Sequence, residues 1–423
     1  MTYADAIQFL CSLQVFGANF GLDNTRRLAA LAGNPQERLR FIHVAGTNGK
    51  GSTCAMLESV YRDAGLRVGL FTSPHLVSFR ERIQVDRRHI SEADVARFVE
   101  EMQPSLVEFP RGQHPTFFEV VTVIALRHFA EQRCDLVIWE TGLGGRLDAT
   151  NIVTPLASVI TNIGFDHQQW LGNTLTAIAT EKAGIIKAGM PVITATEDAE
   201  ALEVIRARAT ELNAPLEIVN AKTGESALPA TIVLPLAGGH QRMNAALALA
   251  TVDALQGVIP VSLECVRRGL ETVHWPGRLQ FVTTSSGQQI LLDGAHNVPG
   301  CDALARSIQE LLPGRKPALL LGMLSDKDCG AMCDRLAPLA KRIGVVAVAS
   351  ERTALPQELA THCRRANPTA RVECFDSVSD ALSRLSSESL VLVGGSLYLA
   401  GEVMALLGLS GTTADERELN EWK

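Results

Sequence analysis

Short runs of apolar and β-branched residues alternate along the chain with longer stretches in which apolar residues recur at helical spacing. This alternation is typical of a mostly parallel β-sheet that is covered by helices. The clearest helical pattern covers 117–131. In the first part of the chain we expect strands over 40–44, 67–71, 135–140, 156–163, 191–195 and 216–219. The fold class is therefore predicted to be α/β.

A second series of the same kind begins after an interruption at 275–288, where Trp-Pro-Gly-Arg and a polar stretch break the periodicity. We predict a larger domain over 1–280 and a smaller Rossmann-like α/β domain over 289–423, with a loosely held tail from 408 onward. Strands are expected there over 289–292, 318–321, 344–348, 371–374 and 390–393. Because ligands of open α/β sheets bind beyond the carboxyl ends of strands, the active site is expected between the domains.

Composition narrows the functional classes. The 423 residues are 46% hydrophobic and 20% charged, an ordinary globular composition for two or three domains. Lys plus Arg (39) and Asp plus Glu (46) give a net charge of −7, which disfavours stable binding to nucleic acid. The longest apolar runs are far shorter than the ~20 residues that span a bilayer, and no secretory signal pattern is present. We expect a cytoplasmic protein, by default a monomer, that has no membrane segment and whose nine scattered cysteines are reduced.

The strongest local motif is a glycine-rich turn between an apolar strand and a helix, at 41–53. Glycines let backbone N–H groups approach phosphate oxygens, while the helix N-terminus and Lys50 add positive potential. The motif departs from Gly-x-x-x-x-Gly-Lys-Ser/Thr, because Val44 stands at the first glycine position and Gly51 is inserted before Ser52. We predict a phosphate-binding loop (P-loop) here, in preference to a turn without a ligand.

Three residues in the first domain each allow a chemical and a structural interpretation. Glu140 ends an apolar strand before a glycine-rich loop, so it is a candidate Mg²⁺ ligand or a solvated strand-end carboxylate. His167 also follows a strand and is a metal ligand, an acid–base group or a hydrogen-bonded loop histidine. Lys182 lies at a helix end, and this position alone favours a solvated lysine that compensates the helix dipole.

The second half of the chain contains further candidates. Arg278, at the domain join, can reach a phosphate held by the other domain or form an interdomain ion pair. Asp293 and His296 follow a strand, where loops carry function in this architecture, although structural capping is the alternative. Ser396 follows two glycines in an anion-binding turn or merely a tight turn.

Seven motifs follow one another in a recognisable order. They are Gly-Thr-Asn-Gly-Lys-Gly-Ser (46–52), Thr-Ser-Pro-His-Leu (72–76), Glu-Thr-Gly-Leu-Gly-Gly-Arg-Leu-Asp-Ala-Thr-Asn (140–151), Asp-His (166–167), Glu-Lys-Ala-Gly-Ile (181–185), Trp-Pro-Gly-Arg (275–278) and Asp-Gly-Ala-His-Asn (293–297). With this set the chain closely resembles the folylpolyglutamate synthase and dihydrofolate synthase family, within the Mur ligase superfamily, over about 18–406.

The resemblance implies an ATP-dependent carboxylate–amine ligase with a central-type ATP-binding domain and a C-terminal glutamate-ligase domain. In this family a substrate carboxylate takes the γ-phosphoryl group of ATP, and the amine of L-glutamate displaces phosphate from the acyl phosphate. ADP and phosphate are the other products, and Mg²⁺ is the implied cofactor. The implied carboxylate substrates are reduced folates and dihydropteroate, and features around Asp148 and Ala149 favour both activities in one enzyme.

The resemblance also assigns roles to individual positions. Matching nucleotide contacts are Asn48, Gly49, Lys50, Gly51, Ser52, Asn244, Arg278 and Asp293. Ser73, Glu140 and His167 match Mg²⁺ ligands. Lys182 matches a lysine that is carbamylated in the family, and His296 matches a residue near the transferring phosphate, so that Lys182, Arg278 and His296 are the implied catalytic positions.

Substrate positions are implied in the same way. For the pterin-bearing substrate they are Ala18, Asn19, Phe20, Thr116, Phe117, Phe118, Glu119, Leu147, Asp148 and Ala149, and for glutamate Ser396 and Tyr398. Aromatic rings at 117 and 118 suit a flat heterocycle, although core packing explains one of them equally well.

Two alternatives remain. A peptidoglycan Mur ligase performs the same chemistry, but such enzymes generally need a domain before the P-loop, and the loop here already starts at Gly46. A nucleotide-dependent module without ligase activity would turn over ATP without folate or glutamate.

Overall fold

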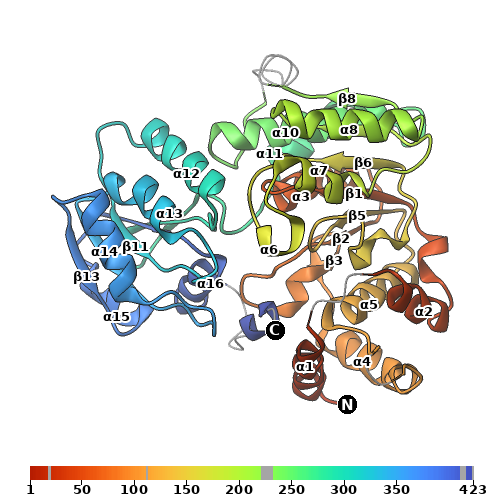
Figure 1. Ribbon diagram of the computed structural model, residues 1–423, viewed down its shortest axis with the longest axis horizontal. Helices are drawn as coiled ribbons and strands as arrows, with labels where there is room; N and C mark the ends of the chain where they lie inside the picture. Colours follow the sequence, from red (N-terminus) through yellow and green to blue (C-terminus); the bar gives the residue numbers. More distant parts are fainter. Residues whose placement is uncertain (18–20, 111–112, 221–231, 410–415, 422–423) are drawn as a thin grey trace.

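Two β-sheets, one in each part of the chain, organise the structure (Figure 1). The computed structural model describes residues 1–423 except 18–20, 111–112, 221–231, 410–415 and 422–423. Ala18, Asn19 and Phe20, which were predicted to contact substrate, therefore lie outside the described residues. The predicted α/β class is confirmed, because both sheets are mostly parallel and covered by helices.

The sheet of the larger domain has eight strands in the order β4-β3-β2-β5-β1-β6-β7-β8. Strands β1, β2, β5, β6, β7 and β8 are parallel, and β3 and β4 extend one edge as antiparallel strands. The strands are β1 (Phe41–Ala45), β2 (Val68–Phe71), β3 (Ile83–Val85), β4 (Arg88–His89), β5 (Leu136–Glu140), β6 (Ala157–Ile160), β7 (Val192–Thr194) and β8 (Leu216–Ile218).

Both faces of this sheet are buried, as its continuous apolar runs predict for parallel strands. On β1, Ile42 and Val44 point into one apolar cluster, while Phe41 points into another on the opposite face. Helix α3 packs in the first cluster and helix α5 in the second. The helices are α1 (Tyr3–Ser12), α2 (Asp23–Leu31), α3 (Lys50–Asp63), α4 (Glu92–Leu106), α5 (Phe117–Glu131), α6 (Gln168–Leu171), α7 (Leu175–Ala183), α8 (Ala199–Glu211), α10 (Gly239–Ala254) and α11 (Leu263–Glu271).

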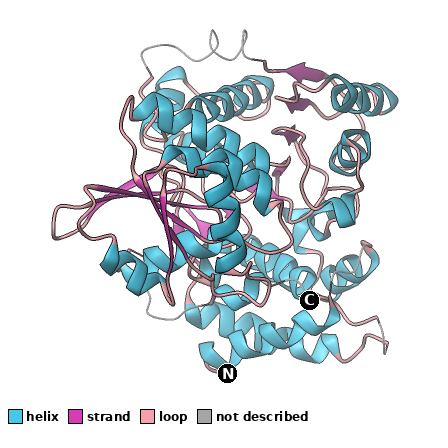
Figure 2. Cartoon of the chain, turned by 60° about the vertical axis from the view of Figure 1, so that its left-hand side comes forward, coloured by secondary structure: helices cyan, strands magenta, loops and turns pink. Residues whose placement is uncertain are grey.

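The smaller sheet has six strands in the order β13-β12-β11-β14-β10-β9, and only β9 runs antiparallel to its neighbour (Figure 2). Its strands are β9 (Gln280–Thr283), β10 (Gln289–Leu292), β11 (Ala318–Leu321), β12 (Arg342–Val345), β13 (Arg371–Cys374) and β14 (Leu390–Gly394). The helices of this part are α12 (Val298–Leu311), α13 (Cys329–Leu336), α14 (Pro356–Ala366), α15 (Val378–Arg384) and α16 (Leu397–Leu406).

Several predicted boundaries were wrong. The strand expected over 156–163 ends at Ile160, and the side chains of Thr161 and Asn162, which follow it, form hydrogen bonds with Asn48 of the P-loop. The strand expected over 344–348 begins at Arg342, whose charge is neutralised by ion pairs with Glu373 and Glu388. Strand β9 was not predicted; it lies within 275–288, where the periodicity of the sequence is interrupted, and pairs with β10. The division of the chain into domains over 1–280 and 289–423 stays a prediction.

The part of the tail that the structure describes beyond 415, residues 416–421, is not loosely held, contrary to the prediction. Residues 416–421 include a 3₁₀ turn, η6 (Arg417–Asn420), and lie between α1 and α16 (Figure 1). Leu419 is fully buried, and only the side chain of Glu418 in this stretch is exposed. No helix among the described residues is long and apolar enough to cross a bilayer.

A loop of the larger domain joins the two cores. Leu76 and Val77 pack in an apolar cluster with strands β10 and β14 and helix α16 of the smaller domain. The backbones of this loop and of α16 lie very close together, since a Cβ on Gly401 of α16 would lie 2.0 Å from the carbonyl oxygen of Leu76. The two domains therefore share buried surface beside the cleft that separates them.

Candidate functional site

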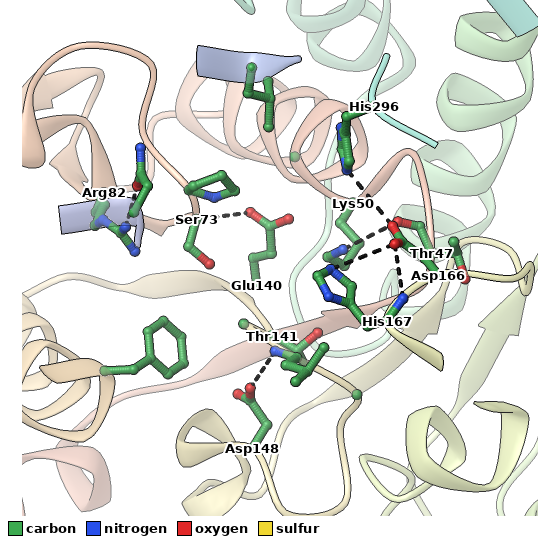
Figure 3. Close-up of a pocket in the computed structure, with 18 of the residues that line it drawn as sticks. Thr47, Lys50, Ser73, Arg82, Glu140, Thr141, Asp148, Asp166, His167 and His296 are labelled. Carbon is green, nitrogen blue, oxygen red and sulfur yellow. Dashed lines mark hydrogen bonds and ion pairs between the residues drawn. The ribbon is translucent and has the colours of Figure 1, made fainter. Parts of the chain in front are cut away.

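A cleft of about 270 Å³ lies between the two domains (Figure 3). It is lined by the P-loop, the end of β5, the loop after β6, the start of α5, and residues of the smaller domain. Most of the predicted site residues line it: Asn48, Gly49, Lys50, Gly51, Ser52, Ser73, Thr116, Phe117, Phe118, Glu119, Glu140, Leu147, Asp148, Ala149, His167, Lys182, Arg278, His296, Ser396 and Tyr398.

Neighbouring side chains leave no room for a Cβ at Gly49 or Gly51 of the P-loop. Gly49 has a φ of +84°, and a Cβ there would lie 2.5 Å from Asn244 Oδ1. Helix α3 then starts at Lys50 with no side-chain cap, so its first N–H groups remain available to phosphate oxygens. The extra glycine has a packing reason, because a Cβ on Gly51 would lie 2.9 Å from the indole of Trp275.

Glu140 and Ser73 meet at the sheet edge that faces the P-loop. The backbone N–H of Ser73 donates to Glu140 Oε2 at 3.1 Å. Burial raises the pKa of Glu140 to about 7, although the positive charge of Lys50 and the bond from Ser73 act in the opposite direction. A desolvated carboxylate of this kind gains from a cation beside it.

Lys182 is not the solvated helix-end lysine that sequence physics alone favours. Its side chain is buried, and its Nζ donates to the carbonyl oxygen of Gly46 at 2.8 Å. Burial, together with the nearby charge of Lys50, lowers the pKa of Lys182 to about 7. A substantial share of the amine is therefore neutral and nucleophilic at neutral pH.

Asp166 is the centre of a polar cluster that joins the domains (Figure 3). Lys327 Nζ donates to Asp166 Oδ1 at 2.6 Å, and Asn297 Nδ2 donates to Oδ2 at 2.8 Å. His296 and His167 lie 3.8 and 3.9 Å from its carboxylate. Burial opposes ionisation of Asp166, but the ammonium group of Lys327 and its hydrogen bond hold the pKa of Asp166 well below the usual range.

The two histidines beside Asp166 are neutral in this surrounding. Burial lowers the pKa of His167 to about 3 and lowers that of His296 as well. The ring nitrogen Nδ1 of His296 lies 2.8 Å from the carbonyl oxygen of Gly294, so this nitrogen carries the proton and Nε2 is left as an acceptor toward the cleft.

Two predicted nucleotide contacts lie outside the lining of the cleft. Asp293 accepts hydrogen bonds from the backbone N–H groups of Leu279 and Ala295, at 3.0 and 2.9 Å. This is the structural capping that the sequence left open. Asn244 donates to Gln241 at 3.0 Å and packs behind Gly49. Arg278, next to Leu279, does line the cleft.

The opposite end of the cleft is aromatic. The guanidinium of Arg82 lies 5.3 Å from the centre of the Phe117 ring, and Phe118 packs against Gly142. Thr116 and Glu119 form the capping box that starts α5, with the Thr116 N–H donating to Glu119 at 2.8 Å. Thr116 and Glu119 therefore stabilise the start of the helix that carries the Phe117 and Phe118 rings.

Asp148 and the turn on the smaller domain close the same end. Asp148 accepts from the N–H groups of Leu143 and Thr150, so it shapes the loop beside Ala149. Ser396 caps α16 by accepting from the N–H of Tyr398 at 3.0 Å. Both Ser396 and Tyr398 remain in the lining of the cleft.

Sequence reasoning missed several lining residues. Asp166 belongs to the Asp-His motif, in which a role was predicted for His167 alone, and Lys327 lies after β11 in an Asp-Lys-Asp turn, a charged pattern that is the only local signal for it. Arg82 precedes a strand that was not predicted, and Arg352 gave no motif signal. Asn420 belongs to the tail that was expected to be loose.

Known proteins match this chain over both domains. Residues 44–252 match the Mur ligase middle domain, and 277–397 match the Mur ligase glutamate ligase domain. A dihydrofolate synthase/folylpolyglutamate synthase of Bacillus subtilis is 37% identical, over 95% of this chain and 98% of that protein.

Solved structures of the same family have the fold of this chain. A folylpolyglutamate synthase of Thermotoga maritima superposes with a TM-score of 0.85 at 32% identity, covering 99% of each chain. Escherichia coli FolC in complex with DHPP and ADP gives 0.84 at 30% identity, covering 97% of this chain and 99% of that one. With its P-loop cleft between two Mur ligase domains, the chain is an ATP-dependent ligase and belongs to the folylpolyglutamate synthase and dihydrofolate synthase family.

Proposed function

We propose that this protein joins L-glutamate to the terminal carboxylate of reduced folates and of dihydropteroate, with ATP as co-substrate. The observation that carries the proposal is one cleft with a phosphate-binding loop at one end and an aromatic wall, Phe117 and Phe118, at the other. The E. coli relative, solved with DHPP and ADP, supports both halves of this assignment.

Residues of both domains form the end of the cleft at which we propose that ATP binds. The free N–H groups at the start of α3, the ammonium of Lys50 and the hydroxyl of Ser52 suit the triphosphate. Arg278 and His296 line the cleft from the opposite side, so they would approach the γ-phosphate when the domains hold substrate between them. Asn244 supports this half indirectly by fixing Gly49, and Asp293 by fixing the turn after Arg278.

Mg²⁺ fits the residues at the end of β5. No cluster of three or more His, Cys, Asp or Glu side chains that could hold a metal occurs within the described part of the chain. Mg²⁺ needs none, because it binds through one or two carboxylates, substrate phosphates and water. Glu140, with Ser73 and His167, would hold it, and the ion would neutralise charge on the phosphates.

Lys182 is proposed to be carbamylated. Its neutral amine would attack CO₂, forming an N–C bond and releasing one proton, and the product is a carboxylate in place of a cation. The buried position and the lowered pKa of Lys182 favour this reaction. A carbamate there would place a further negative group beside the P-loop carbonyl of Gly46.

The reaction would then run along the cleft. Lys50 and Arg278 would stabilise negative charge as the γ-phosphoryl group passes to the folate carboxylate. Ser396 and Tyr398 would contact glutamate, and the acceptor Nε2 of His296 is placed to take a proton from its ammonium group. The amine would attack the acyl phosphate, form the amide and expel phosphate, while the closed domains keep water out.

An ADP-release assay with L-glutamate tests the proposal, with dihydropteroate and tetrahydrofolate compared as carboxylate donors. ADP release that requires glutamate and either donor is expected, with the glutamylated product seen by mass spectrometry. ATP turnover that ignores both substrates would contradict it. A monomer in the cytoplasm is the proposed working form, and size-exclusion chromatography with light scattering tests the monomer.

A further inference from the structure

The C-terminal segment 416–421, here called the C-terminal brace, is bound to both domains. The carboxylate of Glu416 accepts from Tyr3 Oη at 2.9 Å, Ser78 Oγ at 3.0 Å and the Phe79 N–H at 2.6 Å. On the other side, Arg352 Nε of the smaller domain donates to Glu421 Oε2 at 3.1 Å. The brace therefore spans the domain boundary.

The brace also reaches the cleft, since Leu419, Asn420 and Glu421 line it. Arg82 Nη2 donates to the side-chain oxygen of Asn420 at 2.6 Å. The amide nitrogen of Asn420 donates to the carbonyl oxygen of His75 at 2.9 Å. Asn420 thus ties Arg82 to the loop that carries Ser73.

Arg82 is fixed from a second direction. Its Nε donates to Nδ1 of His75 at 2.9 Å, and Nε2 of His75 in turn donates to the carbonyl oxygen of Glu416 at 2.9 Å. Burial, which is the larger cause, and the charge of Arg82 hold the pKa of His75 well below its usual range. The histidine is therefore a neutral spacer between the brace and the guanidinium.

Two of the three Arg82 nitrogens are used in this way, and Nη1 makes no hydrogen bond to any described residue. Arg82 is 3% exposed, and its guanidinium lies over the Phe117 ring at the aromatic end of the cleft. Burial lowers the pKa of Arg82 to about 10, so the group still carries a charge at neutral pH. A buried cation with a spare N–H beside a cavity favours an anionic or carbonyl-bearing ligand.

We propose that Asn420 is a positioning residue that holds Arg82 over Phe117, with its free N–H group directed at the carboxylate-bearing substrate. This inference rests on the proposed function, in which the folate occupies that end of the cleft. The C-terminal brace then decides how tightly the folate binds, while the P-loop binds ATP independently of the brace.

The test compares Asn420→Leu, which keeps the size and removes the bonds, with Asn420→Asp, which keeps the acceptor for Arg82. We expect Asn420→Leu to raise the KM for tetrahydrofolate about tenfold, the effect of one hydrogen bond to a charged group, with the KM for ATP within about twofold. Asn420→Asp loses the bond to the His75 carbonyl oxygen but keeps the one from Arg82, so its KM for tetrahydrofolate should fall between those of wild type and Asn420→Leu. Glu418→Gln, an exposed position on the same segment, is the matched control.

Thermal unfolding of each variant separates folding from binding. If Asn420→Leu does not fold, Asn420→Ser also removes the contact with Arg82 and should give the same selective rise. An unchanged folate KM in a folded variant, an equal rise for ATP, or an Asn420→Asp enzyme as impaired as Asn420→Leu would each overturn the positioning role. A wild-type enzyme that ligates no folate would contradict the proposed function and this inference with it.

Discussion

Lys327 of the smaller domain lies 2.6 Å from Asp166 of the larger domain, and each side chain is only 8% exposed. Asp166 accepts from Asn297 at the same time, and Asn297 exchanges two amide hydrogen bonds with Asn48 of the P-loop at 3.1 and 3.0 Å. The P-loop is therefore connected to the smaller domain through neutral and charged bonds that form only when the domains are close.

Replacing Lys327 with alanine should weaken this connection. The change leaves Asp166 without its closest cation, so we expect a fall of at least about tenfold in kcat/KM and a loss of roughly 2 kcal/mol in the free energy of unfolding. Steady-state kinetics and urea unfolding measure the two effects. Lys341→Ala, at an exposed position of the same domain, is the control, and an equal effect there would refute a specific role for Lys327.

The raised pKa of Glu140 makes the stability of the ligand-free protein depend on pH. The folded state binds the proton more tightly than the unfolded state, so stability is lost as pH rises from about 4.5 through about 7. Glu140→Gln should therefore stabilise the protein by about 3 kcal/mol at pH 8, and by much less at pH 5.

Urea unfolding without nucleotide or Mg²⁺ at the two pH values measures this difference. Glu200→Gln, which changes an exposed carboxylate, provides the control. In activity assays Glu140→Gln should also shift the Mg²⁺ titration to higher concentration. A stability gain that is the same at both pH values would show that Glu140 is not the titrating group.

Lys182→Ala should lose most ligase activity, because the carbamate cannot form. Acetate or a similar small anion should restore part of it by supplying a carboxylate in the space left by the side chain. Lys182→Arg, which keeps a cation but has no reactive amine, should stay inactive with acetate. Wild-type enzyme that is fully active with a plain amine at Lys182, as shown by intact mass and electron density, would exclude carbamylation.

The sequence predicted the chemistry better than the connections between the domains. Glu140 and Lys50 lie at strand ends and in a glycine-rich loop, where short-range patterns are informative. Asp166 and Lys327 are 161 positions apart, and Arg82 and Asn420 are 338 apart, so no local pattern could pair them. The tail was expected to be loose because it is polar, yet two of its polar groups, the carboxylates of Glu416 and Glu421, bind the larger and the smaller domain.

Gly51→Ala tests the departure from the usual P-loop pattern. The new Cβ would lie 2.9 Å from the indole of Trp275, so either the ring or the start of α3 must move. Because the N–H groups at the start of α3 face the phosphates, we expect the KM for ATP to rise about tenfold with a smaller change for folate. Gly257→Ala, where nothing lies within 4 Å of the new Cβ, should behave as wild type. Unchanged ATP kinetics in Gly51→Ala would contradict this account.

Arg278 lies where the chain passes from one domain to the other, and its guanidinium packs against Gly294, whose Cβ would lie 2.3 Å from Nη1. Arg278→Lys keeps the charge but loses the planar fork that can contact two phosphate oxygens at once. We expect kcat to fall at least about tenfold while the KM for folate changes little, because the contact is made as the phosphoryl group transfers. Arg342→Lys, in an ion pair remote from the cleft, is the matched control. Arg278→Lys with wild-type kcat would show that charge alone suffices at this position, and that domain closure does not depend on the fork.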